Sequence, residues 1–437
     1  MAQLTCQHAK KNDVGRHSGL NPTDSDGMLT VVSRSLVWQF PAERCRVLPT
    51  TAPAHPKLKE KRAYFLLTPL GQAGHTFWEN ASMHSDLSLS STAISAATRD
   101  TALPYVGRLS VAPMMDWTDR HCRYFHRLLS QHALLYTEMV TTGALIHGDV
   151  QRHLRMNVEE HPVALQLGGS EPVDLAHCAR LGEAWGYNEI NLNCGCPSER
   201  VQRGAFGACL MAEPQLVADG VKAMLDVVNI PVTVKHRIGI DKTEDYGFVR
   251  DFVGAVSDAG CKVFIVHARN AWLKGLSPKE NREVPPLRHE LVHRLKSDFA
   301  QLTIAVNGGI TTDAQVTEQL EQVDGVMVGR EAYHNPWWLS TWDANFFGAK
   351  PLALTRDIIE SQMVAYMARE MQLHGTPWSA IARHMLGLRH GQPGSRRWRQ
   401  VWSDHRLKQE HPAHVMAIAH AEVEPEVLDG SAQLVIA

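Results

Sequence analysis

From residue 109 onward, short apolar runs rich in β-branched residues alternate with longer stretches in which apolar residues recur every three to four positions. Runs of the first kind predict strands, and stretches of the second kind predict helices. Eight strands are expected, at 109–113, 134–140, 162–167, 189–193, 231–237, 262–267, 303–306 and 325–328. The clearest helices between them are expected at 172–185, 214–227 and 246–259.

Strands that are apolar along their length and alternate with helices are typical of a parallel sheet whose outer face is covered by helices. Eight such units over roughly 240 residues match the size of an α/β barrel of the (β/α)8 or TIM type. We therefore predict a TIM barrel at 105–348. A doubly wound open sheet is the alternative, although no GxGxxG pattern follows the first predicted strand.

The chain changes character on both sides of this region. Residues 1–104 show no sustained period, and the stretch 85–101 is rich in Ser, Thr and Ala, as linkers are. We interpret 1–104 as a disordered extension, or as the result of a start assigned upstream of a true start at Met83. Helical periodicity returns at 354–373, 378–389 and 398–407, so 349–410 is predicted to be a small helical domain. We assign no element to the tail at 411–437.

Composition narrows the class of protein only slightly. Of the 437 residues, 44% are apolar and 21% are charged, which is ordinary for a soluble globular protein. The net charge of −2 does not indicate a nucleic-acid partner. The 8 cysteines include no CxxC pair, so neither a disulfide framework nor a metal site is expected. With no apolar run of bilayer length and no signal-peptide pattern, we expect a cytoplasmic protein without a membrane partner.

Polar, reactive or flexible residues lie at or just beyond the end of each predicted strand. In a TIM barrel the C-terminal ends of the strands form the face that carries the chemistry. A single Gln or His at a strand end is more often a hydrogen-bonding partner in the core, but eight such ends in succession favour a ligand site. In chain order the residues are Pro113, Met114 and Met115; Glu138; Gln166; Asn193 and Cys196; Lys235; His267; Asn307, Gly308 and Gly309; and Gly329 and Arg330.

The last strand ends favour a phosphate ligand. Glycines at 308, 309 and 329 let backbone N–H groups approach a phosphate closely, and Arg330 adds a charge-assisted hydrogen bond. The alternative is that these glycines only permit tight turns. Lys235 on the fifth strand is a costly cation inside a barrel unless it faces an anion, such as the reduced ring of a flavin. Together with Gln166 as a partner of the ring edge, these features suggest FMN.

Several motifs, in this order along the chain, resemble those of the tRNA-dihydrouridine synthase family. They are APMMDWTDR at 112–120, NLNCGCPS at 191–198, RGAFGACLM at 203–211, HAR at 267–269, NGGI at 307–310 and VGR at 328–330. GLSPKENR at 275–282 and HMLGL at 384–388 resemble the A subfamily, which acts at positions 20 and 20a. The resemblance covers about 105–408.

The resemblance implies an FMN-binding barrel, a helical tRNA-binding domain, NADPH as reductant and D-loop uridines as substrate; a monomer is expected. It makes Cys196 the proton donor. The FMN contacts that it implies are Pro113, Met114, Met115, Gln166, Lys235, His267, Asn307, Gly308, Gly309, Gly329 and Arg330. The tRNA contacts that it implies are Asn193, Lys279, Arg282, Arg396 and Arg399.

Reduction of the uracil C5–C6 bond requires a hydride at C6 and a proton at C5, and reduced FMN can deliver the hydride. A thiol suits the proton transfer because its unperturbed pKa of about 8.5 keeps it protonated at neutral pH. Cys196 precedes Pro197, which favours an extended loop past the fourth strand. Cys194 stands where relatives carry an apolar residue, so either thiol is a candidate. Cys122, Cys178 and Cys261 are expected to be structural and buried; Cys209 stays open.

The predicted helical domain is locally basic. Between 383 and 408 there are seven Lys or Arg residues and one acid, Asp404. Turning a base out of folded tRNA costs a few kcal/mol, which a grip on the backbone can supply. Arg396, Arg397 and Arg399, beside Trp398, have the right composition for that grip, and a solvated helix face is the alternative. Two further functions stay open: an FMN barrel acting on a free small molecule, such as a dihydroorotate-type oxidoreductase, and a non-catalytic tRNA-binding protein.

Overall fold

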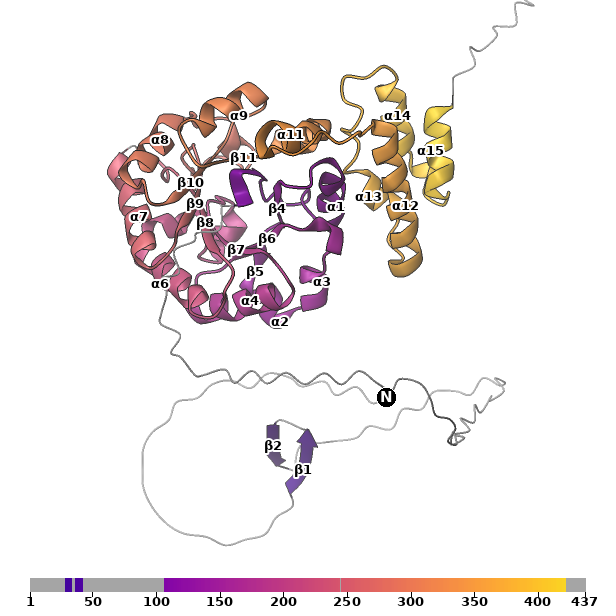
Figure 1. Ribbon diagram of the computed structural model, residues 1–437. Helices are drawn as coiled ribbons and strands as arrows, with labels where there is room; N and C mark the ends of the chain where they lie inside the picture. Colours follow the sequence, from indigo (N-terminus) through magenta and orange to yellow (C-terminus); the bar gives the residue numbers. More distant parts are fainter. Residues whose placement is uncertain (1–27, 34–35, 42–105, 244, 422–437) are drawn as a thin grey trace, which may run out of the picture. The chain divides into compact units, whose positions relative to one another are not determined.

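The structure, a computed structural model, describes residues 28–33, 36–41, 106–243 and 245–421 (Figure 1). The chain divides into two compact units, Met1–Ala93 and Ile94–Ala437. In the first unit, β1 (Met28–Ser33) and β2 (Leu36–Pro41) pair as an antiparallel hairpin, to which the periodicity assigned no element. The rest of the extension at 1–104, including Met83 and the stretch 85–101, lies outside the described residues.

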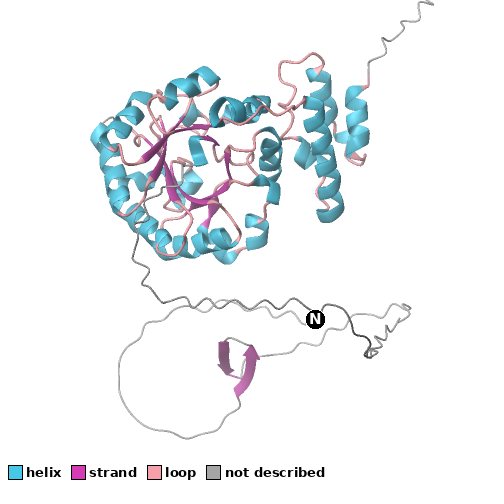
Figure 2. Ribbon diagram, viewed as in Figure 1, coloured by secondary structure: helices cyan, strands magenta, loops and turns pink. Residues whose placement is uncertain are grey.

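Eight parallel strands of the second unit close into a barrel, which confirms the predicted TIM fold (Figure 2). β3 pairs with β11 on one side and with β4 on the other, and the pairing of β4 with β6 completes the ring. A short β5 (Val140–Thr141) adds to β6, so the predicted strand 134–140 is in fact two strands. The barrel strands are β3 (Leu109–Val111), β4 (Leu134–Tyr136), β6 (Val163–Gly168), β7 (Glu189–Cys194), β8 (Val232–Arg237), β9 (Val263–His267), β10 (Thr303–Asn307) and β11 (Gly325–Val328).

Helices cover the outside of the barrel and bury one apolar face each. In α7 (Tyr246–Asp258), which Asp245 caps, the buried residues Val249, Phe252, Val253 and Val256 follow the helical period. The predicted helices at 172–185, 214–227 and 246–259 are confirmed as α4, α6 and α7. The barrel helices are α1 (Arg120–Leu129), α2 (Thr142–His147), α3 (Val150–Leu154), α4 (Pro172–Ala184), α5 (Glu199–Arg203), α6 (Pro214–Leu225), α7, α8 (His289–Asp298), α9 (Asp313–Leu320), α10 (Arg330–His334) and α11 (Trp342–Phe347).

A group of four helices follows the barrel: α12 (Arg356–His374), α13 (Trp378–Ala382), α14 (Ser395–Trp402) and α15 (Pro412–His420). The predicted helix at 378–389 ends at Ala382 and continues as turns, and the region 398–407 contains the end of α14 and a 3-10 turn, His405–Leu407. None of the helices in the described part of the chain has both the length and the apolar composition needed to cross a membrane.

We assign no element to the tail at 411–437 from the sequence, and this is wrong. The tail contains a helix, α15, which packs on α12 and α14. This helix has only 9 residues, and its buried residues Val415 and Ala419 make a single apolar pair one turn apart. So short an apolar pattern is too weak to predict a helix, which here depends on packing against its neighbours.

Glu360 of α12, which is 0% exposed, is the central acceptor of the helical domain. Its Oε1 atom accepts hydrogen bonds from the indole N–H groups of Trp398 at 2.7 Å and Trp402 at 2.9 Å, both on α14. Its Oε2 atom accepts from Arg389 at 2.9 Å and lies 2.9 Å from Nε2 of His420 on α15. One carboxylate therefore joins three helices and the loop that carries Arg389.

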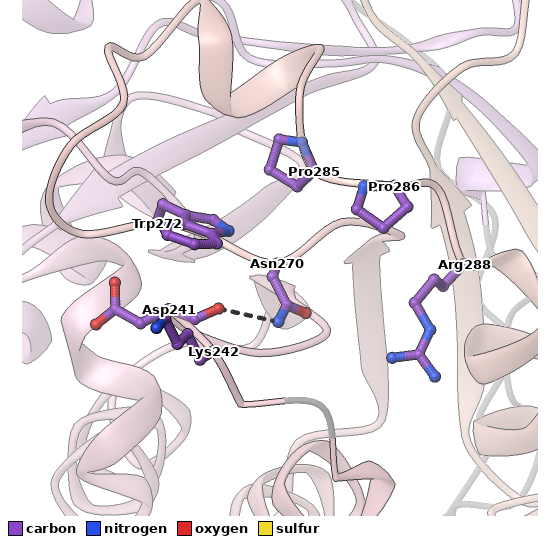
Figure 3. A pocket seen from close by; sticks show the side chains of 7 residues that line it. All are labelled: Asp241, Lys242, Asn270, Trp272, Pro285, Pro286 and Arg288. Carbon is purple, nitrogen blue, oxygen red and sulfur yellow. Dashed lines mark hydrogen bonds between the residues drawn. The ribbon is translucent and has the colours of Figure 1, made fainter.

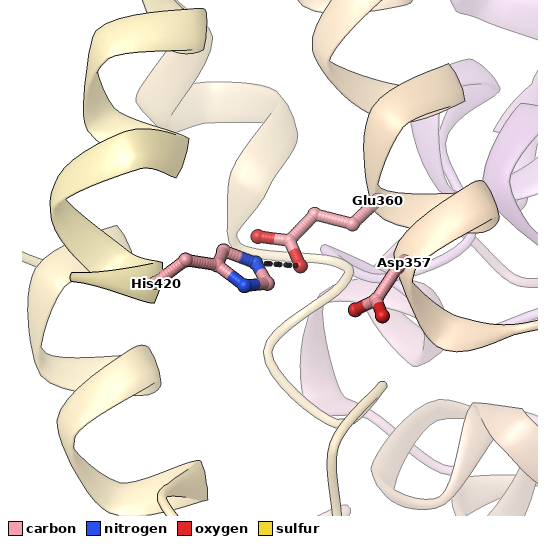
Figure 4. Close-up of side chains that lie close together, drawn as sticks. All are labelled: Asp357, Glu360 and His420. Atoms are coloured by element: carbon pink, nitrogen blue, oxygen red, sulfur yellow. Dashed lines mark hydrogen bonds and ion pairs between the residues drawn. The ribbon is translucent and has the colours of Figure 1, made fainter. Parts of the chain in front are cut away.

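Asp357, Glu360 and His420 lie close enough together to share one cation (Figure 4). The guanidinium group of Arg389 forms ion pairs with both Asp357 and Glu360. The positive charge that two neighbouring carboxylates require is therefore supplied by the chain itself, and the cluster needs no metal ion to be stable.

Asp119, at the start of α1, connects the barrel with the helical domain. Its Oδ1 atom accepts hydrogen bonds from the N–H groups of His121 and Cys122, and its Oδ2 atom from Arg383 at 2.8 Å and His384 at 3.0 Å. Burial alone raises the pKa of Asp119, but the hydrogen bond and the charge of His384 outweigh it and hold the pKa below its usual range.

One ring stack and two ion pairs strengthen this joint between barrel and helical domain. Tyr366 of α12 stacks on Tyr124 of α1, with ring centroids 3.9 Å apart. Glu370 of α12 forms ion pairs with Arg120 at 2.6 Å and Arg155 at 3.3 Å. The barrel and the helical domain therefore form one continuous packed body.

The segment HMLGL at 384–388 forms the tightest part of this joint. A Cβ atom at Gly387 would lie 2.5 Å from the carbonyl oxygen of His334, the last residue of α10, and 2.6 Å from Cδ of Pro336. Met385 and Leu388 are fully buried on either side. Residues that resemble a subfamily motif thus hold the two parts of the unit together.

We expect Gly387→Ala to destabilise the protein by about 2 kcal/mol, because the added methyl group overpacks against backbone atoms that cannot move alone. Gly143→Ala in α2 is the matched control, since nothing lies within 4 Å of a Cβ atom there and alanine favours a helix. Thermal unfolding should show a lower melting temperature for Gly387→Ala only. Equal melting temperatures for both variants would mean that the joint is not tight.

Candidate active site

The structure gathers the predicted site residues of neighbouring strands at the C-terminal face of the barrel. The register pairs Asn193 of β7 with Lys235 of β8, and Asn307 of β10 with His267 of β9. Gln166 lies near the end of β6, opposite Asn191 of β7. Five strand ends therefore present amide, imidazole and ammonium groups to the same region.

Lys235 is held by an amide rather than by an acid. Its Nζ atom donates to Oδ1 of Asn307 at 3.1 Å, and Nδ2 of Asn307 in turn donates to the carbonyl oxygen of Met327 at 2.7 Å. Burial, together with the charge of Arg237, lowers the pKa of Lys235 to about 7. Within the described residues no carboxylate pairs with this ammonium group, so it is available to an anionic ligand.

His267 is neutral at physiological pH, because burial and the charges of Arg237 and Lys235 lower the pKa of its imidazole well below the usual range. Its ring packs against the backbone of the next strand end, where a Cβ atom at Gly308 would lie 2.8 Å from Cδ2 of His267. Gly308 and Gly309 have φ angles of 118° and 74°, which non-glycine residues rarely adopt. The tight turn that was one interpretation of these glycines is therefore present, and the side chains of His267 and Leu287 lie close against it.

Residues that follow the last strand, β11, and the first strand, β3, complete this face. Arg330 begins α10 and pairs with Glu283 at 2.5 Å. The nearest atom to a Cβ placed on Gly329 is Cβ of Ala112, 4.0 Å away, so the backbone there is uncrowded. Beyond β3, Pro113 and Met114 are partly buried and Met115 is 55% exposed.

Cys196 lies on the loop after β7, and Asn193 shapes that loop. Oδ1 of Asn193 accepts hydrogen bonds from the N–H groups of Gly195 and Cys196, each at 3.0 Å. The Cys196 thiol is partly exposed, and its Sγ lies 3.6 Å from Oγ of Ser198. Cys194 is 0% exposed on the face of β7 that meets the helices, and burial raises the pKa of its thiol strongly. Of the two candidate thiols, only Cys196 is open to a substrate.

The other cysteines have the environments expected of structural residues. Cys122, Cys178 and Cys261 are fully buried, and burial raises the pKa of each thiol. Cys209 is partly exposed, and its thiol donates to the carbonyl oxygen of Phe206 at 3.1 Å.

Arg237, at the end of β8, was not singled out from the sequence. Its guanidinium group donates to the carbonyl oxygens of Gly195 at 3.1 Å, Asn270 at 3.3 Å and Asn281 at 3.0 Å. Burial lowers its pKa to about 9. Arg237 thus ties the Cys196 loop to two neighbouring loops. Its position two residues after Lys235, on the same face of the strand, was the available signal.

The segment 275–282 lies next to this site, because Arg282 is close enough to interact electrostatically with Cys196. Asn281 is fully buried and anchors the segment through hydrogen bonds with the backbone of Trp272, Leu276 and Ser277. Lys279 and Arg282 flank it and are exposed. These two predicted tRNA contacts are thus presented to solvent near the accessible thiol.

A pocket next to this segment contains none of the predicted site residues (Figure 3). Asn270 and Arg288 point toward it, and Nδ2 of Asn270 donates to the carbonyl oxygen of Asp241 at 3.3 Å. Its lining combines an indole with one acidic and two basic side chains. The lining residues are Asp241, Lys242, Asn270, Trp272, Pro285, Pro286 and Arg288.

Six of the seven Lys and Arg residues between 383 and 408 fall into two groups. Four of them have partners inside the protein: Arg383 with Asp119, Arg389 with Glu360, Arg406 with Asp404, and Arg397 with backbone carbonyls at the end of α15. Trp398 is buried, so it is not available for stacking on a base. Arg396 and Arg399 of α14 are exposed and have no hydrogen bond or ion pair within the described residues.

A buried carboxylate, Glu189 of β7, lies deeper in the barrel. Its Oε1 atom accepts hydrogen bonds from the hydroxyl groups of Tyr136 and Thr233, each at 2.6 Å. Burial raises the pKa of Glu189 to about 7, although both hydrogen bonds oppose the shift.

Comparison with known proteins identifies the family of this barrel. Residues 110–423 match the family described as dihydrouridine synthase, a range that includes α15. Proteins named tRNA-dihydrouridine(20/20a) synthase are similar over most of their length. The chain is 59% identical to that of Pseudomonas syringae pv. tomato over 305 residues, which are 70% of this chain and 90% of the relative. It is 58% identical to that of Escherichia coli K12 over 320 residues (72% and 91%), and 55% identical to that of Vibrio vulnificus over 324 residues (74% and 98%).

The family and the relatives thus make this chain a flavin-dependent oxidoreductase. The chain belongs to the dihydrouridine synthase family.

We expect the stability of the protein to depend on the ionisation of Glu189. Because the pKa of this group is raised from 4.5 to about 7 on folding, its contribution is fully present below pH 4.5 and is lost as the pH rises through 7. The full shift corresponds to about 3 kcal/mol. Relative to Glu189→Gln, which does not titrate, the wild type should therefore melt at progressively lower temperatures between pH 5 and pH 8. A difference in melting temperature that does not change with pH would contradict the expectation.

Proposed function

We propose that this protein reduces the C5–C6 double bond of uridine to 5,6-dihydrouridine at positions 20 and 20a in the D-loop of tRNA, with FMN as cofactor and NADPH as reductant. The family and the names of the relatives support the reaction and the substrate. The observation that carries the proposal is the accessible Cys196 thiol on the loop beyond β7, at the barrel face that also holds Lys235, His267 and Asn307.

The residues of this face fit FMN. The partly buried Lys235 ammonium group has an amide as its partner and no carboxylate within the described residues, which suits the anionic edge of a reduced flavin ring. The uncrowded backbone at Gly329 and the left-handed turn at Gly308 and Gly309 suit a phosphate group. We propose as FMN contacts Pro113, Met114, Met115, Gln166, Lys235, His267, Asn307, Gly308, Gly309, Gly329 and Arg330.

The chemistry that FMN supplies when bound is the hydride for C6 of the uracil ring. The proton for C5 comes from the Sγ atom of Cys196, and a thiol is a suitable acid because negative charge develops at C5 and at the adjoining C4 carbonyl group. Asn193 and Arg237 hold the loop that carries this thiol. We propose that the protein acts as a monomer.

For tRNA we propose contacts at two places. Lys279 and Arg282 are exposed beside the Cys196 loop, and Asn193 lies beneath it. Arg396 and Arg399 are exposed on α14 and make no hydrogen bond or ion pair within the described part of the chain. Phosphate contacts at both places supply binding energy that can offset the cost of unstacking the target base.

Purified protein tests the proposal directly. We expect it to be yellow, with absorbance near ~450 nm that NADPH bleaches, and to form dihydrouridine at positions 20 and 20a in tRNA that lacks it. A colourless protein, or one whose bleached flavin recovers with a free pyrimidine but not with tRNA, would contradict the proposal.

In the same assay, Cys196→Ala should retain FMN and NADPH bleaching but lose at least about a hundredfold in dihydrouridine formation, since a positioned acid contributes roughly that much. Cys194→Ala is the control, and we expect near-normal activity because its thiol is buried outside the barrel face. Full activity of Cys196→Ala would remove the assignment of this thiol as the proton donor.

The double variant Arg396→Ala and Arg399→Ala should bind tRNA more weakly and with less dependence on salt. Each lost phosphate contact lowers the slope of log affinity against log salt by about 0.7–0.9. Arg406→Ala is the matched control in the same domain, because the charge of Arg406 already faces Asp404. The slope is measured by fluorescence anisotropy with labelled tRNA. An unchanged slope in the double variant would mean that Arg396 and Arg399 do not contact the tRNA phosphates.

A further inference from the structure

A continuous chain of hydrogen bonds runs through the interior of the barrel and starts at the Cys196 loop. The N–H group of Cys196 donates to Oδ1 of Asn193 at 3.0 Å. Nδ2 of Asn193 donates to Oε1 of Gln166 at 2.8 Å, and Nε2 of Gln166 donates to Oδ1 of Asn191 at 2.7 Å. Three amide side chains from two adjacent strands are thus linked in sequence.

The chain continues from Asn191 to the other end of the barrel. Nδ2 of Asn191 donates to Oγ1 of Thr233 on β8 at 2.8 Å. The Thr233 hydroxyl group donates to Oε1 of Glu189 at 2.6 Å. Glu189, Asn191 and Thr233 are almost completely buried and do not take part in the reaction proposed above.

All of these hydrogen bonds point in one direction, and the chemistry of the two ends requires that direction. At the Cys196 end of the chain, the backbone N–H groups of Gly195 and Cys196 can only donate, so Asn193 must present its oxygen to them. Its Nδ2 group must then donate to Gln166, and the same constraint passes to each following side chain. The chain needs an acceptor at its lower end, and the Glu189 carboxylate is that acceptor.

We propose that Glu189, Thr233 and Asn191 are positioning residues, which hold the Cys196 loop and the amide of Gln166 in their working orientation from the opposite end of the barrel. This inference rests on the proposed function, in which Gln166 touches the flavin and Cys196 protonates the substrate. A reversed amide anywhere in the chain would set two N–H groups against each other, and a reversed Asn193 would withdraw the acceptor from the N–H groups of Gly195 and Cys196.

The Thr233→Val variant cuts the chain with little change of shape. It removes the acceptor of Asn191 and one donor to Glu189, while the valine methyl groups fill the same space. Tyr136→Phe is the matched control. It removes the other 2.6 Å hydrogen bond to the same carboxylate oxygen but leaves every hydrogen bond between Cys196 and Glu189 in place. Glu189→Gln is the conservative variant, since its amide oxygen still accepts from Thr233.

The experiment uses FMN-loaded protein and separates the two halves of the reaction. NADPH bleaching is followed first, and then the recovery of the flavin band after mixing with tRNA that lacks dihydrouridine. We expect Thr233→Val to bleach within twofold of the wild-type rate and to recover at least about tenfold more slowly, because small misplacements of reacting groups have effects of this order. Tyr136→Phe and Glu189→Gln should recover at close to the wild-type rate.

A second readout does not depend on the reaction. The rate at which iodoacetamide alkylates Cys196, measured by peptide mass spectrometry, reports the freedom of the loop. We expect this rate to rise several-fold in Thr233→Val and to stay at the wild-type value in Tyr136→Phe and Glu189→Gln. If Thr233→Val yields no folded protein, Glu189→Leu cuts the same chain at its lower end and replaces it in both measurements.

The outcomes separate this proposal from the proposed function. If Thr233→Val matches the wild type in both recovery and alkylation, the positioning role is wrong. If Tyr136→Phe is as slow as Thr233→Val, the effect comes from the buried carboxylate in general, and the chain is again wrong. If wild-type flavin does not recover with tRNA, the proposed function fails, while the alkylation rates still decide whether the chain holds the loop.

Discussion

The closure of eight parallel strands into a ring imposes the constraint on which the rest of this structure depends, because the inner face must be filled with side chains from all strands. One arc of the ring fills it with apolar groups, among them Leu134, Ile265 and Met327. The opposite arc, at β7 and β8, fills it with polar groups that bond to one another. The site lies where this polar arc reaches the C-terminal end of the barrel. Its side chains are therefore hydrogen-bonded to side chains deeper in the barrel rather than to solvent.

Much of this could be predicted from the sequence, because the strand pattern is repeated eight times and the strand ends carry distinctive residues. The polar arc could not. Asn191 and Thr233 are 42 positions apart, and their hydrogen bond depends on the register of two strands, which periodicity does not reveal. The orientation of the Cys194 side chain could have been predicted. Neighbouring side chains in a strand point to opposite faces, so Cys194 had to point away from Asn193. The helix at 412–420 was missed because its apolar pattern is too short to stand out from a tail.

The segment HMLGL at 384–388, which in the sequence only resembles a subfamily motif, has a structural role at the joint between the barrel and the helical domain. His384 and Gly387 touch neither the Cys196 loop nor the exposed arginines of α14; they contact Asp119 and His334 instead. Their role is to set the distance and the angle between the two parts of the molecule. In a protein whose substrate is much larger than its reactive atoms, such a joint can matter as much as the residues at the centre of the site.

The net charge of −2 hides how differently the cations of the helical domain are used. Arg389 lies between two carboxylates and holds helices together, whereas Arg396 and Arg399 face solvent from α14. Folding and surface charge are therefore carried by separate residues that lie close together in the chain. A substitution at an exposed position of this kind leaves the contacts within the fold intact, so the strength of surface binding can be changed without loss of stability.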